Sequence, residues 1–280
     1  MRAPSRSWFS ELEKSRDQSY LVEDTNRFPI FPWLAPTLHP EVQSFINRWG
    51  VEKHLKPKDP VLGHITDRVD QLVLVKSGIT IRYFGSPYAS KNHCFAFSAP
   101  GRLACGNLNF FTHRPCIGSY FAALPSTVVS VPQKLVDSVC RSDPEFMRLL
   151  VQEFEVINLT DRLGFGALFL LSVEDRLLAF YLTWAAHFGH MEVIDGEEWI
   201  RMPIPLRGEV LLGILGCSQS AIERYMAQMK QEGIYVVEDT SARIKLSVLR
   251  PIHDWIRNHE EKSSDLPRDQ LTQILNDLNI

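Results

Sequence analysis

The sequence predicts an α+β protein, with a β-rich N-terminal half and a helical C-terminal half that ends in a helix-turn-helix. Three observations support this prediction. Short apolar stretches separated by turn residues occupy residues 51–131, a long apolar segment with helical spacing follows Pro144, and two short helical segments meet at Gly216 before a hairpin pattern. A run of strands followed by a run of helices favours an α+β arrangement over alternating βαβ units.

The N-terminal half has the pattern of short antiparallel strands. Residues 72–75 form an apolar run typical of a buried strand, and residues 79–83 alternate apolar and polar side chains as a half-buried strand does. Turn signals such as Pro100 followed by Gly101 interrupt the pattern. Further candidate strands lie at 94–97, 119–123 and 127–131. The set predicts an antiparallel barrel or roll.

A long helix is predicted after residue 143. Pro144 suits the first helical turn, with Ser142 or Asp143 as the N-cap. Large apolar residues recur on one face at helical spacing: Phe146, Leu150, Phe154 and Ile157. This face is unusually apolar for a surface helix, so we expect a second copy of the same helix to cover it. Gly164 and Gly166 predict a weakened or bent far end.

The C-terminal half contains a helix-turn-helix pattern. Leu211 and Leu215 mark the inner face of a short helix, and Gly216 allows a tight connection to the next helix, which Ser218 can cap. The inward residues of this second helix are Ile222, Tyr225, Met226 and Met229. Residues 234–237 and 244–246 then alternate as a hairpin that would form a wing. Two short helices joined by a glycine turn are typical of DNA-binding proteins.

In this combination the chain resembles the Crp/Fnr family, the regulators similar to the cyclic-AMP receptor protein. The matching stretches are 72–78, 100–101, 106–111, 129–135, 173–189 and 204–246. The resemblance implies an N-terminal antiparallel β-roll sensor, a long dimerisation helix and a C-terminal winged helix-turn-helix that binds DNA. It divides the chain into an arm with a short helix at 1–44, a β-roll at 45–141, a dimer helix at 142–171, a winged helix at 172–250 and an extension at 251–280.

The resemblance also assigns DNA contacts. The second helix of the motif, here 219–231, enters the major groove by its N-terminal residues, and Arg224 matches the base-contacting arginine whose fork suits guanine. Ser220 stands where the family usually has glutamate, so the familiar operator half-sites are not expected. The other predicted groove residues are Gln219, Ala221 and Glu223. Candidates for phosphate contacts are Ser218, Lys230, Ser241 and Arg243.

The residues that bind cyclic AMP in the family are missing from the matching positions. Asn107 stands in place of the ribose-binding glutamate, and residues 117–119, which include Ser119, contain no arginine for the phosphate. Arg114 lies nearby, but its register argues against a substitute role. Asp161 and Arg162 align with the long-helix hydroxyls that touch the base. These five positions define the candidate effector pocket, and we expect its effector not to be cyclic AMP.

In an alternative interpretation, aromatic residues of the β-rich half line an apolar cavity that binds a small-molecule ligand. The candidates are Phe95, Phe97, Phe110, Phe111, Tyr120 and Phe121. Packing in the core of a β-roll explains the same residues without any ligand.

Composition limits the other classes of function. The net charge is −3 and the isoelectric point about 6.3, so a DNA-binding surface must be a local patch. The five cysteines form no C-x-x-C pair, which favours free thiols in a reducing cytoplasm over a zinc or iron–sulfur site. No catalytic motif, signal peptide or membrane-spanning run is present in the sequence. We expect a bacterial, cytoplasmic protein that is not an enzyme and needs no cofactor.

The leading hypothesis is a homodimeric transcription regulator that binds double-stranded DNA, with RNA polymerase or another regulator as a further partner and no membrane. One alternative is a protein-interaction module that has kept the fold but lost DNA binding, and another is an apolar small-molecule sensor. The C-terminal extension carries two apolar groups at helical spacing: Ile252, Trp255 and Ile256, and then Leu271, Ile274, Leu275 and Leu278. It either folds back on its own domain or docks on another chain.

Overall fold

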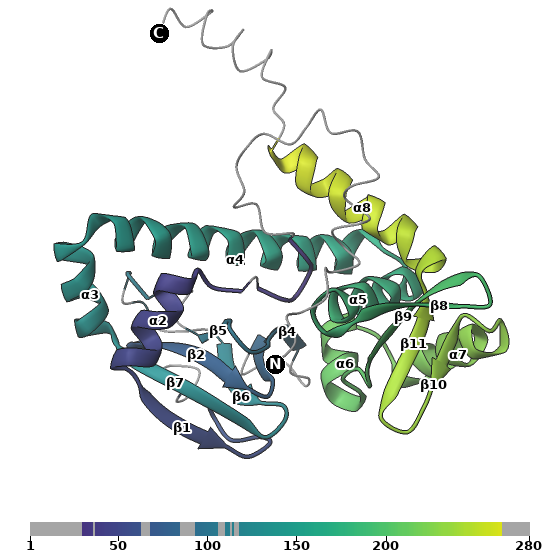
Figure 1. Cartoon of the computed structure of the whole chain (residues 1–280), viewed down its shortest axis with the longest axis horizontal. Helices are drawn as coiled ribbons and strands as arrows, with labels where there is room; N and C mark the ends of the chain where they lie inside the picture. Colours follow the sequence, from purple (N-terminus) through teal and green to yellow (C-terminus); the bar gives the residue numbers. More distant parts are fainter. Residues whose placement is uncertain are drawn as a thin grey trace, which may run out of the picture.

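The computed structural model describes residues 30–35, 37–62, 68–84, 93–105, 110–112, 114 and 118–264. Helix α4 (Pro144–Leu170) runs along the N-terminal domain and reaches the C-terminal domain. The β-rich N-terminal domain lies beneath one part of α4, and the C-terminal domain lies at its other end (Figure 1). The predicted α+β class, with strands first and helices after them, is confirmed.

The N-terminal domain is a roll of two antiparallel sheets, as predicted. Their strand orders are β1-β7-β2-β5 and β4-β3-β6. The strands are β1 (Val51–Leu55), β2 (Gln71–Ser77), β3 (Thr80–Phe84), β4 (His93–Ser98), β5 (Leu103–Cys105), β6 (Gly118–Ala122) and β7 (Ser126–Pro132). Strand β7 alternates buried and half-buried residues along most of its length, because one face packs on the core. Three helices flank the roll: α2 (Pro40–Trp49), α3 (Gln133–Ser142) and α4.

Helix α4 begins at an aspartate cap. The Asp143 carboxylate accepts hydrogen bonds from the backbone N–H groups of Glu145 and Phe146, and Pro144 occupies the first turn. The Ser142 hydroxyl instead donates to backbone carbonyls of α3, so Asp143 is the cap.

The far end of α4 is continuous through both of its glycines. A Cβ at Gly164 would lie 2.8 Å from the Trp33 ring, whereas a Cβ at Gly166 would make an ordinary 3.9 Å contact with Trp255. Gly164 is therefore present because the Trp33 indole packs directly on the helix backbone. The helix does not end at either glycine but continues to Leu170.

The face of α4 predicted to meet a second subunit is buried within its own chain. Phe146, Leu150, Phe154 and Ile157 all belong to the hydrophobic core of the roll. The Phe146 ring packs edge-on against Phe45 of α2, with centroids 4.8 Å apart, and the Phe154 ring contacts Phe111 at 5.5 Å. The assignment of these four residues to a dimer interface was wrong. Apolar periodicity identifies the face that is buried but not the element that buries it.

The C-terminal domain is a second hydrophobic core built around a small antiparallel sheet of order β10-β11-β9-β8. Its helices are α5 (Val173–Phe188), α6 (Gly208–Leu215), α7 (Gln219–Gln231) and α8 (Leu246–Ser264). Its strands are β8 (His190–Ile194), β9 (Glu197–Pro203), β10 (Tyr235–Val237) and β11 (Ser241–Lys245).

Helix α8 runs without a break across residues 250 and 251, where the sequence suggested the start of an extension. Its Ile252 and Ile256 are buried in the core of the C-terminal domain, and Trp255 packs against the same core. This part of the extension therefore folds back on its own chain. The second predicted apolar group, residues 271–278, lies outside the described residues.

Segments from both domains meet near the end of α4. The backbone N–H of Phe97 in β4 donates to the Trp33 carbonyl at 2.9 Å, and the Thr183 hydroxyl of α5 lies 3.4 Å from the Pro32 carbonyl. Helix α6 packs on β4. The N-terminal segment thus joins the roll to α5.

A buried arginine strengthens this junction. The Arg102 guanidinium donates to the Ala35 and Pro100 carbonyls and to His187 Nε2 of α5. Burial lowers the pKa of Arg102 to about 10, and burial together with the charge of Arg102 lowers the pKa of His187 to about 3. The neutral imidazole can therefore accept the hydrogen bond. None of the described helices is long and apolar enough to cross a membrane.

Candidate nucleic-acid interface

The turn between α6 and α7 has the geometry that the sequence predicts. Gly216 ends α6 in the left-handed conformation, at φ 59°, and its N–H donates to the Leu212 carbonyl. Ser218 caps α7, because its hydroxyl accepts from the Ala221 N–H at 3.4 Å. Arg176 of α5 donates to the Leu215 carbonyl at 2.6 Å, which satisfies an acceptor at the end of α6. Sequence reasoning missed Arg176, since no local pattern connects it to this turn.

Helix α7 has one buried and one exposed face. Ile222 and Met229 are buried, and Tyr225 and Met226 are half-buried against the domain core. The predicted groove and phosphate residues of the exposed side are Ser218, Gln219, Ser220, Glu223, Arg224 and Lys230, and Ala221 is half-buried. All of the predicted α7 contacts except Ala221 are therefore accessible to a partner.

The exposed polar side chains of α7 make only local contacts. The Gln219 amide donates to the Glu223 carboxylate at 2.7 Å, and the Arg224 guanidinium lies 4.9 Å from the centre of the Tyr225 ring. An i,i+4 pair such as Gln219–Glu223 contributes about 0.2–0.5 kcal/mol, and an exposed cation–π contact about 0.5–1 kcal/mol. A base edge or a phosphate can compete with them at small cost.

In the wing between β10 and β11, Glu238 forms ion pairs with the neighbouring arginine side chains. Its carboxylate accepts from the Ser241 hydroxyl at 2.9 Å, pairs with Arg243 and lies 3.5 Å from Arg201. These contacts, led by the Ser241 hydrogen bond, lower the pKa of Glu238. Ser241 is buried, so its predicted phosphate contact was wrong: the hydroxyl is used inside the wing. Arg243 is partly exposed but already paired.

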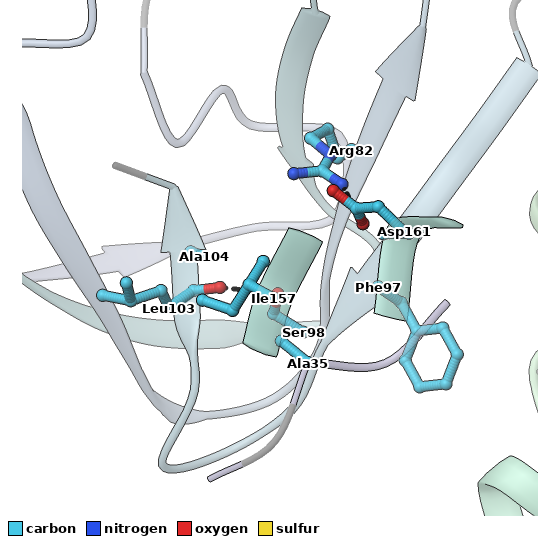
Figure 2. A pocket seen from close by; sticks show the side chains of 9 residues that line it. Ala35, Arg82, Phe97, Ser98, Leu103, Ala104, Ile157 and Asp161 are labelled. Atoms are coloured by element: carbon cyan, nitrogen blue, oxygen red, sulfur yellow. Dashed lines mark hydrogen bonds and ion pairs between the residues drawn. The ribbon is translucent and has the colours of Figure 1, made fainter. Parts of the chain in front are cut away.

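The structure separates the predicted effector residues. Asp161 is buried in α4, where its carboxylate meets the Arg82 guanidinium of β3 at 2.5 Å (Figure 2). Arg162 and Arg114 are exposed, Ser119 is half-buried in β6, and Asn107 lies outside the described residues. Arg162 therefore does not share the buried surroundings of Asp161. Sequence reasoning missed Arg82, although an arginine inside a buried strand is an unusual feature.

The aromatic residues proposed to line a ligand cavity are divided between the two hydrophobic cores. Phe97, Phe110 and Tyr120 are buried in the cores, and the Phe110 ring lies edge-on to Phe111 at 5.2 Å. The Phe97 ring also contacts Trp184 of α5 at 5.8 Å. Core packing therefore explains these side chains. The side chain of Phe95 lies outside the described part of the structure.

No protein-family model matches this chain, and no curated protein matches it in sequence. Solved structures do match its fold. FixK2 from Bradyrhizobium japonicum superimposes with a TM-score of 0.61 at 14% identity, over 73% of this chain and 96% of that one. A CooA mutant from Carboxydothermus hydrogenoformans gives 0.60 at 18% identity, over 78% and 96%.

A transcriptional regulator of the CRP/FNR family from Thermus thermophilus also matches, with a TM-score of 0.54 at 15% identity, over 73% of this chain and 98% of that one. These structures share the order of roll, long helix and C-terminal helical domain with the present chain. The resemblance seen in the sequence is thereby confirmed at the level of the fold. This chain has the fold of the Crp/Fnr regulators.

Proposed function

We propose that this chain is a sequence-specific DNA-binding transcription regulator that acts as a homodimer. The observation that supports this function best is the exposed face of α7, which a capped helix-turn-helix and a wing hold out from the domain. Polar groups suited to base edges line this face, and apolar groups anchor the opposite one. A rigid helix with this division of faces fits the major groove.

Each exposed side chain of α7 has a distinct chemical role in this proposal. Arg224 donates two hydrogen bonds to guanine, and Gln219 pairs with adenine or bonds to a phosphate. The Glu223 carboxylate accepts from the amino group of cytosine. Lys230 neutralises a phosphate without reading the base. The N-terminal N–H groups of α7 favour a phosphate as well, because they are the positive end of the helix dipole.

The proposal of a homodimer is based on exposed apolar residues on the outer face of α4. Phe169 is 84% exposed, and Val151, Phe165 and Leu170 are also exposed large apolar residues on this helix. Between them, Val156, Leu159 and Leu163 are only half-buried. Such a long apolar stripe is unfavourable in water, and a second α4 is a partner of matching length and chemistry. Two α7 helices would then read half-sites about one helical turn of DNA apart.

DNA binding is tested by incubating the protein with sheared genomic DNA from its source and sequencing the retained fragments. The wild type should retain fragments with a shared motif, and Arg224→Ala should lose discrimination at one base pair by about 1–3 kcal/mol. Arg148→Ala is the matched control, since this exposed arginine lies on α4, away from the interface. Retention of the same motif by Arg224→Ala would contradict the assigned base contact.

Dimerisation is tested separately by sedimentation equilibrium. Phe169→Glu places a charge on the outer face of α4 and should weaken self-association at least tenfold, whereas Val193→Glu alters an exposed apolar residue of β8 and should not. A wild-type chain that remains a monomer at high micromolar concentration would contradict the homodimer, whatever the DNA result.

The wing favours a second candidate function, a protein-interaction module with this fold. Glu238 engages Ser241 and Arg243, and both were expected to bind phosphates. The salt dependence of binding separates the two functions. A DNA-binding protein loses affinity steeply between 50 and 200 mM salt, by about 10³-fold or more if several phosphates are contacted. A protein-interaction module should show no DNA affinity at either salt concentration.

A further inference from the structure

The interior of the roll contains an ion pair between elements that are far apart in the sequence. Arg82 and Asp161 are 79 residues apart, and their side chains are only 8% and 9% exposed. The pair joins the sheet β4-β3-β6 to the C-terminal half of α4 (Figure 2). Burial raises the pKa of Asp161, while the charge and the hydrogen bond of Arg82 oppose that rise.

A buried ion pair of this kind is a weak source of stability but a strong positional constraint. The desolvation of two charges largely offsets their attraction, whereas the loss of one partner leaves an uncompensated buried charge. The pair therefore adds little compared with an apolar contact of the same size. It does, however, fix the position of β3 against α4, because any shift that kept both groups buried would leave each charge without its partner.

The chamber around the pair leaves little room for any other ligand of Arg82. Its walls are mostly small or apolar and include Ala35, Phe97, Leu103 and Ile157. The chamber has a volume of about 10 Å³, roughly what one water molecule requires. Typical ligand pockets measure roughly 300–1,000 Å³. An anion that approached this guanidinium would have to displace the Asp161 carboxylate.

We propose that Asp161 is a built-in ligand of Arg82, which keeps α4 docked on the roll without a small anionic effector. The carboxylate supplies from within the chain the charge that an anionic effector would bring, so DNA binding is not gated by such a molecule. This inference rests on the proposed function, because it concerns the control of the same DNA-binding activity.

The position of the pair connects it to the DNA-binding domain. Helix α4 ends at Leu170, and α5 starts at Val173, so the direction of the end of α4 sets where the C-terminal domain begins. Strand β4, whose Phe97 lines the chamber, also packs against α6 of the helix-turn-helix. Release of α4 from the roll would therefore disturb the placement of α6 and α7.

The test removes the internal carboxylate and supplies a free one. Asp161→Ala should lower the melting temperature by about 10 °C and weaken binding to the retained DNA fragments at least tenfold. Formate at about 50 mM should raise the melting temperature of this variant by several degrees, compared with the same concentration of chloride, because it can bind the vacated guanidinium. DNA affinity should recover in parallel.

Two controls keep the result interpretable. The double variant Arg82→Met/Asp161→Leu, which removes both charges of the pair, should melt near the wild type and show no response to formate. The wild type should shift by less than 1 °C with formate or with cyclic AMP, because its guanidinium is already occupied; this measurement does not depend on the folding of any variant. A shift of several degrees in the wild type would overturn the proposal, as would an Asp161→Ala variant that melts normally.

The melting and DNA readouts separate this inference from the proposed function. Rescue of the melting temperature by formate, in a protein that retains no DNA with or without formate, would support Asp161 as an internal ligand and contradict the regulator. DNA binding by the wild type, together with an Asp161→Ala variant that melts normally, would support the regulator and contradict the internal ligand.

Discussion

The two faces of α4 serve different purposes, although they belong to one helix. The inner face carries Phe154, Ile157 and Asp161 into the interior of the roll, where rings stack and a charge is paired. The outer face carries Val151 and Phe169, which are exposed. The inner face therefore belongs to the fold of the single chain. The outer face is the surface that we propose for a second chain.

This difference shows that the most regular apolar stripe of a helix need not form a subunit interface. Phe146, Leu150, Phe154 and Ile157 are the most regularly spaced large apolar residues of the segment, and their own domain covers all four. The stripe left for a partner is less regular and includes polar residues such as Arg162. Intrachain packing uses the best apolar surface first, because it needs no second molecule.

The largest expected effect compares a phenylalanine from each face. Phe154→Ala should lower the free energy of unfolding by about 3–5 kcal/mol, since it removes a ring packed on Phe110 and Phe111 and leaves a cavity. Phe169→Ala should change the stability of the monomer by less than about 0.5 kcal/mol, because the ring is already exposed. Urea unfolding at a protein concentration low enough to keep the chain monomeric measures both values. Similar losses from both variants would contradict the division into two faces.

An intermediate effect compares the two glycines. Gly164→Ala should destabilise the protein by about 1–3 kcal/mol, because its Cβ would overlap the buried Trp33 ring. Gly166→Ala should stabilise the protein by about 0.5–1 kcal/mol, because its Cβ only touches Trp255 and alanine favours the helix. Thermal unfolding of the two variants side by side gives the sign of each change. If Gly164→Ala were also stabilising, Trp33 would not be packed on α4 as described.

A third comparison uses the dependence of stability on pH, because the inner face carries a buried carboxyl group. Burial raises the pKa of Glu153 from 4.5 to about 7, although its carboxylate accepts the His39 N–H at 2.6 Å. Because this pKa is higher in the folded state, the folded chain binds more protons, and wild-type stability should fall as pH rises from about 4.5 to about 7. Glu153→Gln removes this loss. Its stability relative to wild type should increase across that window and stay constant above it.

Gln152→Ala, at an exposed and uncharged position of the same helix, is the control for that titration. It removes no titratable group, so its difference from the wild type should not change between pH 5 and pH 8. The pKa of His187, lowered to about 3, makes a contribution of opposite sign below about pH 6.5, but it is common to all three proteins and cancels in the differences. If the difference in unfolding free energy between Glu153→Gln and the wild type also stayed constant with pH, the Glu153 carboxyl of the wild type would be solvated rather than buried.

Most of the local structure could be predicted from the sequence, because it depends on neighbouring residues. The Asp143 and Ser218 caps and the left-handed Gly216 each need only a few residues of context. The roll and the helix-turn-helix followed from such elements in order. The exposed residues of α7 were also predictable, since helical periodicity separates them from Ile222 and Met229.

The tertiary structure decided which surfaces meet. Only folding brings Arg82 to Asp161, sets Trp33 on Gly164 and turns Ser241 toward Glu238 inside the wing. Periodicity and capping act over one or two helical turns, whereas these contacts join residues from separate elements or depend on the path of a hairpin. The sequence by itself determined the elements and their apolar faces. The packing of the two domains around α4 decided which of these faces are buried within the chain and which remain exposed.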